Sequence, residues 1–311
     1  LILAGAGTGK TTTIIARIEY LIKYKNANPS SMLVLTFTKK ATENLKNKLL
    51  DIVGLEAEFI EVGTFHELAL SITVDNYGLL GYSDKPRIMD NSDIYFLMTK
   101  HFNELMQLQS SIFRKNPIIA LQTFKKIFEA FSCNLLEEGE LKKIKDKELE
   151  KLDILEDEKD LEKSKQLIDV INAYPYYQKW KKGRDWIDFG DMINNFWLLL
   201  KNNSDILKSI QKKYKHVIVD EFQDNNYALS QIIEIIAYPE DSLTVVGDDD
   251  QCIYAFRQAN VNNVFRFLSK YYSADKKAIV LIKNYRSKQL ILDIANKVIV
   301  NNGQRIEKPK L

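Results

Sequence analysis

The feature that most constrains this chain is the glycine-rich segment AGAGTGKT near its beginning. It follows the apolar run Leu1–Ala4 and precedes a run with helical spacing. The phosphate-loop pattern G-x-x-x-x-G-K-[ST] is matched at Gly9, Lys10 and Thr11, although Ala4 occupies the first glycine position. Glycines let successive backbone N–H groups turn toward a phosphate, and the N-terminus of the next helix adds positive dipole character. The segment therefore predicts a strand–loop–helix unit that binds a nucleoside triphosphate.

The residue types in this loop suit that task. Lys10 would reach the β- and γ-phosphates, and the Thr11 hydroxyl would ligate Mg²⁺. A glycine turn with a chance lysine is the alternative, and the strand before and helix after the loop weigh against it. A dinucleotide-binding G-x-G-x-x-G that starts at Gly5 is excluded because Lys10 stands at its last glycine position. The predicted nucleotide-binding residues of the loop are Ala4, Gly5, Ala6, Gly7, Thr8, Gly9, Lys10, Thr11 and Thr12.

A second candidate lies in the segment HVIVDEFQD, where an apolar run ends in two acids. In phosphate-loop folds a carboxylate at this place holds Mg²⁺, which predicts Asp220 as a metal ligand beside Thr11. The neighbouring Glu221 is suited to orient or deprotonate an attacking water. Gln223 offers an amide that can contact the γ-phosphate. The alternative is a pair of solvated acids at a strand end.

The distribution of apolar residues predicts an α/β fold. Short runs without alternation are typical of central parallel strands covered on both faces, and helical stretches lie between them. The predicted strands are Leu1–Ala4, Met32–Phe37, Phe59–Phe65, Val217–Val219, Leu243–Val246 and Ala278–Ile282. The clearest helical stretches are Thr11–Lys23, Lys39–Val53 and Ala228–Ile236.

The middle of the chain has a different texture, with Leu, Lys, Glu and Phe at helical spacing. We predict that residues 77–191 form an all-helical subdomain inserted into an α/β domain made of residues 1–76 and 192–277. Gly and Pro residues indicate breaks within the insert. These breaks are expected at Gly78, Gly81, Pro86, Pro117 and Pro175.

Composition excludes several classes of protein. The apolar content of 45% is ordinary for a globular chain of 311 residues. Two cysteines do not make a disulfide framework, and three histidines away from them argue against a structural zinc site. No apolar run is long enough to span a membrane and no export leader is recognisable, so we expect a cytoplasmic protein. The net charge of +2 neither supports nor excludes a nucleic-acid partner.

Seven sequence blocks, taken in order, identify a family resemblance. The chain resembles the UvrD/Rep/PcrA-type superfamily 1 DNA helicases over essentially its whole length. The blocks are AGAGTGKT, LTFTKKATENLKNKL, GTFHELAL, DFGDM, VDEFQD, VVGDDDQCIYAFRQA and NYRS. The resemblance implies a RecA-like P-loop NTPase sheet, ATP with Mg²⁺, and a partner of single-stranded DNA or a single-strand/duplex junction. It also implies 3′→5′ travel in DNA repair or replication.

The resemblance adds site residues that the pattern of the chain does not give. It implies that Gln251 and Arg286 contact the γ-phosphate and that Tyr285 stacks on adenine, so the candidate catalytic residues are Lys10, Glu221, Gln251 and Arg286. Bases gripped without sequence preference stack on aromatic rings. The candidate DNA contacts are Thr36, Phe37, His66, Tyr254, Phe256 and Arg257. For each aromatic residue the alternative is core packing.

The resemblance also indicates what this chain lacks. The family continues into a second motor domain, and we expect residues 278–311 to be its opening strand and helix. The chain would then be an ATP-binding fragment, weak or inactive in hydrolysis by itself. Departures from the family pattern include Gly190 in place of an acid and Gln258 in place of a glycine. A GTPase or transporter-type ATPase is disfavoured because its signatures are absent. A P-loop module that binds DNA without motor activity remains the alternative.

Overall fold

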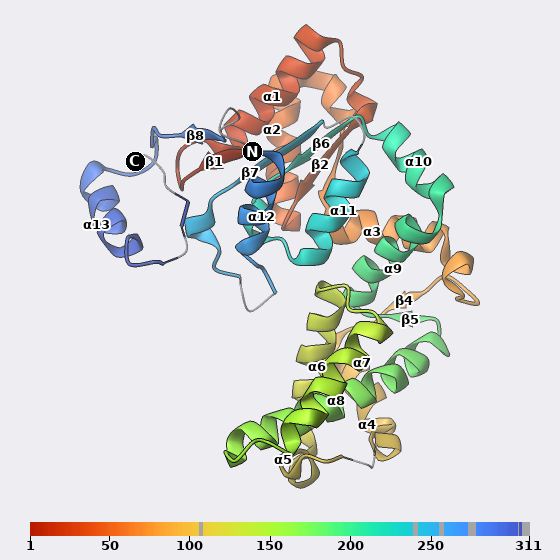
Figure 1. Ribbon diagram of the computed structural model, residues 1–311. Helices are drawn as coiled ribbons and strands as arrows, with labels where there is room; N and C mark the ends of the chain where they lie inside the picture. The colour runs from red at the N-terminus through yellow and green to blue at the C-terminus, as the bar shows by residue number, and fades with distance from the viewer. Residues whose placement is uncertain (106–107, 239–241, 255–257, 273–277, 304, 307–311) are drawn as a thin grey trace. The chain divides into compact units, whose positions relative to one another are not determined.

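The chain divides into a sheet unit, Leu1–Leu68 with Leu200–Leu311, and a helical unit, Ala69–Leu199. The computed structural model describes residues 1–311 except 106–107, 239–241, 255–257, 273–277, 304 and 307–311 (Figure 1). The sequence placed the insert at 77–191, and the observed unit is longer at both ends. The difference arises within α3 (Phe65–Asp75) and α9 (Phe189–Asn202), the two helices in which the chain passes from one unit to the other.

The sheet unit is built on six strands in the order β3-β2-β6-β7-β1-β8, and every neighbouring pair is parallel. Each of the six predicted runs overlaps one of these strands, which confirms the α/β prediction. Residues of the inner strands are buried on both faces, as expected for a covered parallel sheet. The strands are β1 (Ile2–Ala4), β2 (Met32–Thr36), β3 (Glu61–Thr64), β6 (His216–Val219), β7 (Leu243–Gly247) and β8 (Ile279–Leu281).

Helices α1 and α2 cover one face of this sheet (Figure 1). Their apolar residues recur at helical spacing and share one buried core with alternate residues of the strands, a core that includes Ile18, Leu45 and Val34. The start of α2 is fixed by Thr38, whose side chain accepts a hydrogen bond from the backbone N–H of Ala41. The helices of this unit are α1 (Lys10–Lys25), α2 (Lys39–Val53), α10 (Ser204–Lys213), α11 (Tyr227–Ala237), α12 (Asn262–Tyr271) and α13 (Gln289–Ile299).

The last strand differs from its sequence prediction. We expected residues 278–311 to begin a second domain, whereas β8 pairs with β1 through Ile279, Val280 and Leu281. These residues are apolar and hydrogen-bonded to the strand of the phosphate loop, so β8 extends the first sheet. As a result, β1 lies between β7 and β8, and the carboxyl ends of the three strands meet at one edge.

The helical unit has one large core of aromatic and aliphatic residues, including the buried Phe113, Phe124 and Phe128. It is not wholly helical, because Arg87 and Ile88 pair in parallel with Trp186 and Ile187. Pro175 lies inside α8 and does not break it, contrary to expectation; the nearby Tyr174 and Tyr177 are held in the core of this unit. The α-helices and strands wholly within this unit are β4 (Arg87–Ile88), α4 (Asn91–Lys100), α5 (Ser111–Lys115), α6 (Pro117–Cys133), α7 (Glu138–Leu152), α8 (Glu158–Lys182) and β5 (Trp186–Ile187).

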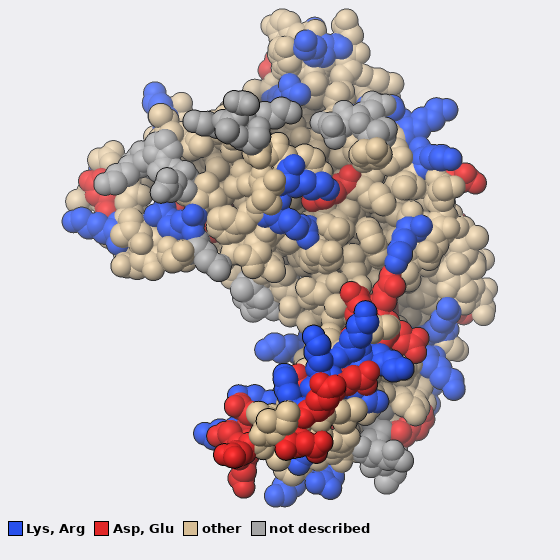
Figure 2. Space-filling model, in the orientation of Figure 1, with Lys and Arg blue, Asp and Glu red and all other residues tan. Residues whose placement is uncertain are grey.

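Charges of both signs are interspersed over the visible face of the helical unit (Figure 2). Many come from α7 and the first turns of α8, whose sequences alternate Lys with Glu and Asp. Such mixed charge is typical of a solvated helix surface. Within the described part of the chain, no helix combines the length and apolar character needed to cross a membrane.

Candidate nucleotide-binding site

The glycine-rich loop between β1 and α1 has the conformation that its sequence predicts. Gly7 and Gly9 have φ values of 78° and 93°, in the left-handed region that favours glycine. The N–H and the hydroxyl of Thr8 both donate to the carbonyl of Gly5, at 3.3 and 2.8 Å, and close the turn. Helix α1 then begins at Lys10, and its first-turn N–H groups lack partners one turn earlier in the helix. The loop is a backbone cradle at a helix N-terminus, which suits an anion.

The NYRS segment after β8 is fastened to this loop. The Asn284 amide donates to the carbonyl of Ala6 at 2.6 Å, and the N–H of Tyr285 donates to the carbonyl of Gly7 at 2.8 Å. A Cβ added at Gly7 would lie 2.7 Å from the Cβ of Arg286, so only glycine fits this close approach. Arg286 is exposed beside the loop, and the Tyr285 side chain is 72% exposed.

Lys10 links two further segments to the loop. Its Nζ lies 2.9 Å from Glu221 Oε2 and donates to Gln251 Oε1 at 3.4 Å. The Lys10 side chain is 10% exposed, whereas the Glu221 side chain is 35% exposed. One ammonium group therefore joins the loop after β1, the acids after β6 and the turn after β7.

The two acids after β6 have unusual settings. Glu221 has a φ of 50°, a conformation that costs a non-glycine residue roughly 1 kcal/mol or more. Its N–H donates to Asp220 Oδ1 at 2.9 Å. Burial, followed by the negative charge of Glu221, raises the pKa of Asp220 to about 6. A cation beside Asp220 would offset both effects, because it favours the ionised carboxylate.

Gln223 connects the ends of β6 and β7. Its amide nitrogen donates to Glu221 Oε2 at 2.8 Å, and its amide oxygen accepts from the N–H of Asp248 at 2.9 Å. A Cβ at Gly247 would lie 2.8 Å from that oxygen, so the glycine at the end of β7 makes room for it. The sequence predicted a γ-phosphate contact for Gln223. In the structure both ends of its buried amide hold protein groups.

Two buried polar residues that follow Gln223 in the sequence lack some of their possible hydrogen bonds. Asp224 is 6% exposed and Asn225 is fully buried. Among the described residues, Asp224 Oδ1 and both polar atoms of the Asn225 amide have no hydrogen-bond partner. Burial, then the charge of Glu221, raises the pKa of Asp224 to about 7. Such unpaired groups are costly in a core and are found preferentially at functional sites.

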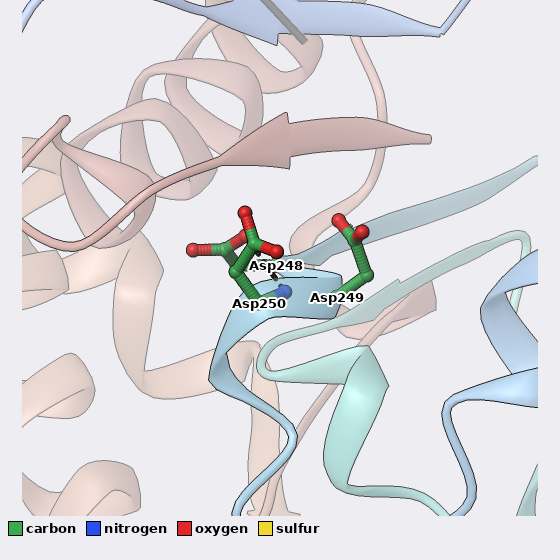
Figure 3. A group of neighbouring side chains, drawn as sticks. All are labelled: Asp248, Asp249 and Asp250. Atoms are coloured by element: carbon green, nitrogen blue, oxygen red, sulfur yellow. Dashed lines mark hydrogen bonds between the residues drawn. The ribbon is translucent and has the colours of Figure 1, made fainter. Parts of the chain in front are cut away.

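Three aspartates line the turn after β7. One carboxylate oxygen from each of Asp248, Asp249 and Asp250 lies within 4.8 Å of the others. Figure 3 shows the three carboxylates on the same side of the ribbon. They belong to the one-turn helix η6 (Asp249–Gln251) and its N-cap Asp248, which accepts from the N–H of Asp250 at 3.2 Å. They hold the turn that presents Gln251.

Residues predicted to contact DNA have four different settings. Thr36 is buried, and its hydroxyl bonds to Thr42 at 2.7 Å, so it serves the start of α2. Phe37 and Tyr254 are half-buried and lie together, with ring centroids 5.4 Å apart and planes at 31°. His66 is half-buried in the first turn of α3, where burial lowers its pKa. Phe256 and Arg257 lie outside the described residues.

Comparison with known proteins gives the site its context. The UvrD/REP helicase N-terminal domain profile matches residues 1–272. The chain belongs to this family. It is 33% identical over 314 aligned positions to the ATP-dependent DNA helicase PcrA of Staphylococcus aureus (strain Mu50) and to that of Staphylococcus epidermidis (strain ATCC 12228). Each alignment covers all of this chain and 39% of the relative, so the chain spans well under half the length of these helicases.

The UvrD/REP blocks explain which contacts the sequence could suggest and which it missed. The loop, the acids after β6, Gln251 and NYRS all stand in these blocks, and contacts of Lys10 and Asn284 join them in the structure. Asn284 was missed as a site residue although it stands in NYRS, because its role depends on a backbone carbonyl far away in sequence. The burial of Asp224 and the contact between Asp250 and Arg305 had no signal in the block letters.

Proposed function

We propose that this chain is the ATP-binding part of a DNA helicase that couples Mg-ATP hydrolysis to movement along single-stranded DNA and duplex unwinding. One observation carries the proposal. Lys10 of the phosphate loop contacts both Glu221 and Gln251, at 2.9 and 3.4 Å. Three blocks that are far apart in the sequence thus meet at one ammonium group beside an anion-binding cradle.

The loop would bind the phosphates of ATP. Gly7 and Gly9 give the backbone its inward curl, and Lys10 has three donors for phosphate oxygens. When phosphate oxygens take those donors, Glu221 is released from its ion pair. Its side chain, already 35% exposed, then becomes available to orient or deprotonate a water.

The residues present suit Mg²⁺. Thr11 lies in the first turn of α1, and Asp220 offers a buried carboxylate whose pKa is raised by burial. Hydroxyl and carboxylate oxygens are the ligands that Mg²⁺ prefers. Bound Mg²⁺ supplies charge neutralisation at the phosphates. Thr11 and Asp220 would hold it, while Gln251 and Arg286 would contact the γ-phosphate from the turn after β7 and from NYRS.

The adenine and DNA contacts follow from the exposed rings. Tyr285 presents a ring beside the loop, suited to stack on a base. Phe37 and Tyr254 form a pair at which a DNA base can stack, for about 1–3 kcal/mol per base. Arg257 and Phe256 would extend that contact, and His66 would add a polar one. Phosphate contacts would make DNA binding weaken with salt.

The remaining features of the proposal come from the family. The relatives are more than twice as long, and we propose that a second motor domain completes the ATP site in the full-length protein. We further propose 3′→5′ travel, loading at single-strand/duplex junctions, and a role in DNA repair or replication in the cytoplasm. The chain alone would then bind ATP weakly and hydrolyse it poorly.

The test is phosphate release by the full-length protein with and without a single-stranded oligonucleotide. We expect stimulation by DNA, and we expect Glu221→Gln to lose turnover while retaining ATP binding. Unwinding of duplexes with 3′ or 5′ tails reports the direction of travel. DNA binding without any ATP turnover would overturn the motor and favour the passive P-loop module. Full turnover by Glu221→Gln would remove the role assigned to that residue.

A further inference from the structure

Arg305 makes a paired contact with the turn that carries Gln251. Its Nε lies 2.8 Å from Asp250 Oδ1, and its Nη2 lies 2.8 Å from Asp250 Oδ2. This fork-to-carboxylate geometry fixes orientation as well as distance. The two side chains are 26% and 16% exposed, so the pair is partly shielded from water.

The next residue reinforces the contact. The backbone N–H of Ile306 donates to Asp249 Oδ2 at 2.7 Å. Two successive residues after α13 thus hold two successive aspartates of η6. No residue of α13 is buried, and these contacts join the segment after it to the turn after β7.

A short series of hydrogen bonds connects the contacts of Arg305 and Ile306 to the candidate phosphate site. The N–H of Asp250 donates to Asp248 Oδ1 at 3.2 Å (Figure 3). The Gln251 amide nitrogen donates to Asp248 Oδ2. The other end of the Gln251 amide accepts from Lys10. A shift of Asp250 would therefore change the place or direction of the Gln251 side chain.

We propose that Arg305 is a positioning residue, which holds η6 so that Gln251 faces the nucleotide phosphates. The segment after α13 would then control turnover, because its displacement would release Asp250. This inference rests on the proposed ATP hydrolysis. A competing role is simple neutralisation of three neighbouring aspartates, and the two roles differ in whether the fork of the guanidinium is needed.

The experiment uses the full-length protein with Arg305→Ala, Arg305→Lys, Asp250→Asn and the double variant Arg305→Ala/Asp250→Asn. DNA-stimulated turnover gives kcat and KM, and a fluorescent ATP analogue gives affinity. We expect Arg305→Ala to lower kcat by about 10- to 100-fold, since small misplacements of a positioned group have effects of this size. The KM for ATP should change by less than about 3-fold, because the loop itself is intact.

The other variants separate the two roles. Arg305→Lys keeps the charge but not the fork, so a kcat near that of Arg305→Ala supports positioning, and a kcat near wild type supports neutralisation only. The double variant should be no slower than the slower single variant, since both break one contact. Arg87→Ala is the matched control, because Arg87 and Asp93 pair at 2.8 Å in the helical unit. Thermal unfolding of each variant confirms that it is folded.

The outcomes distinguish this inference from the proposed function. Suppose that wild type hydrolyses ATP and that Lys10→Ala does not. If Arg305→Ala then turns over ATP as fast as wild type, Arg305 has no positioning role. If wild type shows no turnover, or if Lys10→Ala retains it, the proposed function fails and this inference fails with it.

Discussion

Among the described residues, Lys181 and Lys10 are nearly buried lysines that meet carboxylates, and they differ in how completely they are paired. In the helical unit, Lys181 lies 2.6 Å from Asp188 and 2.5 Å from Asp191, with its side chain 2% exposed. In the sheet unit, Lys10 meets Glu221, whose side chain is 35% exposed. The first cluster is closed by protein, whereas the second is open on one side.

The closed cluster satisfies its own groups. Asp188 and Asp191 exchange hydrogen bonds with each other's backbone N–H at 2.9 Å, which caps α9. Tyr177 donates to Asp188 at 2.9 Å. Burial opposes the charge on Lys181, but the two carboxylates outweigh it and raise its pKa well above the usual value. Lys181 therefore links the end of α8 to the start of α9.

The open cluster leaves groups unsatisfied. Glu221 has a strained backbone, and Asp224 Oδ1 has no hydrogen-bond partner within the described ranges. Strained backbone and unpaired polar groups persist only where the surrounding structure compensates for their cost, and they are common at functional sites. The comparison teaches that completeness of pairing, rather than burial of a lysine, separates a structural ion cluster from a candidate active site.

The largest expected effect is on stability, in the closed cluster. Lys181→Met leaves two carboxylates buried without their cation and should lower the free energy of unfolding by about 3–5 kcal/mol. Urea denaturation followed by circular dichroism measures it. Lys182→Met, at the exposed neighbouring position, is the control and should change little. A loss below about 1 kcal/mol for Lys181→Met would mean that the cluster does not stabilise the contact between α8 and α9 as we describe.

The corresponding change in the open cluster should act on turnover instead. Lys10→Ala should lower ATP turnover by about 10²–10³-fold, as expected for loss of a donor aimed at developing charge. Its effect on the free energy of unfolding should stay within about 1 kcal/mol, because Glu221 remains hydrated. Phosphate release and urea denaturation give the two values. Destabilisation as large as that of Lys181→Met would erase the contrast between the clusters.

A smaller effect is expected at Tyr285, whose ring stands beside the open site. Tyr285→Ala should weaken ATP binding by about 5- to 10-fold, the size of one stacking contact. Tyr285→Phe keeps the ring and should bind as wild type. Titration with a fluorescent ATP analogue measures both. Equal affinity for all three proteins would exclude a stacking role.

The last expected effect is a pH dependence of the free energy of unfolding. The pKa of Asp224 rises from its ordinary 3.8 to about 7, so the folded protein holds this proton more tightly than the unfolded chain. Its contribution to the free energy of unfolding therefore falls as pH rises between these two values. Asp191, with a pKa raised to about 6 by burial and Asp188, has the same sign over a narrower range.

The measurement compares wild type with Asp224→Asn by urea denaturation at about pH 5 and about pH 8. The variant should lose less stability than wild type between the two conditions. Asp90→Asn, at an exposed helix cap, is a control outside the site. An unchanged difference between the conditions would show that Asp224 is not the group responsible.

The sequence predicted the sheet and the strand-end loops well because short apolar runs and glycine spacing have local causes. Gly7 and Gly9 need their φ values whatever the rest of the chain does. The pairing of Lys181 could not be predicted, because a lysine in a charged helix looks solvated until α9 packs against it. Gly190 is similar: its departure from the family acid has a reason only where a Cβ would lie 2.8 Å from the Cβ of Ser132.

The order of the strands has a consequence for changes in chain length. The phosphate loop, η6 and NYRS leave from three adjacent strands, β1, β7 and β8. Inserting one residue within β7 would turn Val246 away from α1 and advance Gln251 by about 3.3 Å relative to Lys10. Single-residue insertions or deletions in any of these strands should therefore be far more damaging than substitutions of similar bulk, and alignments of relatives can be checked for gaps there.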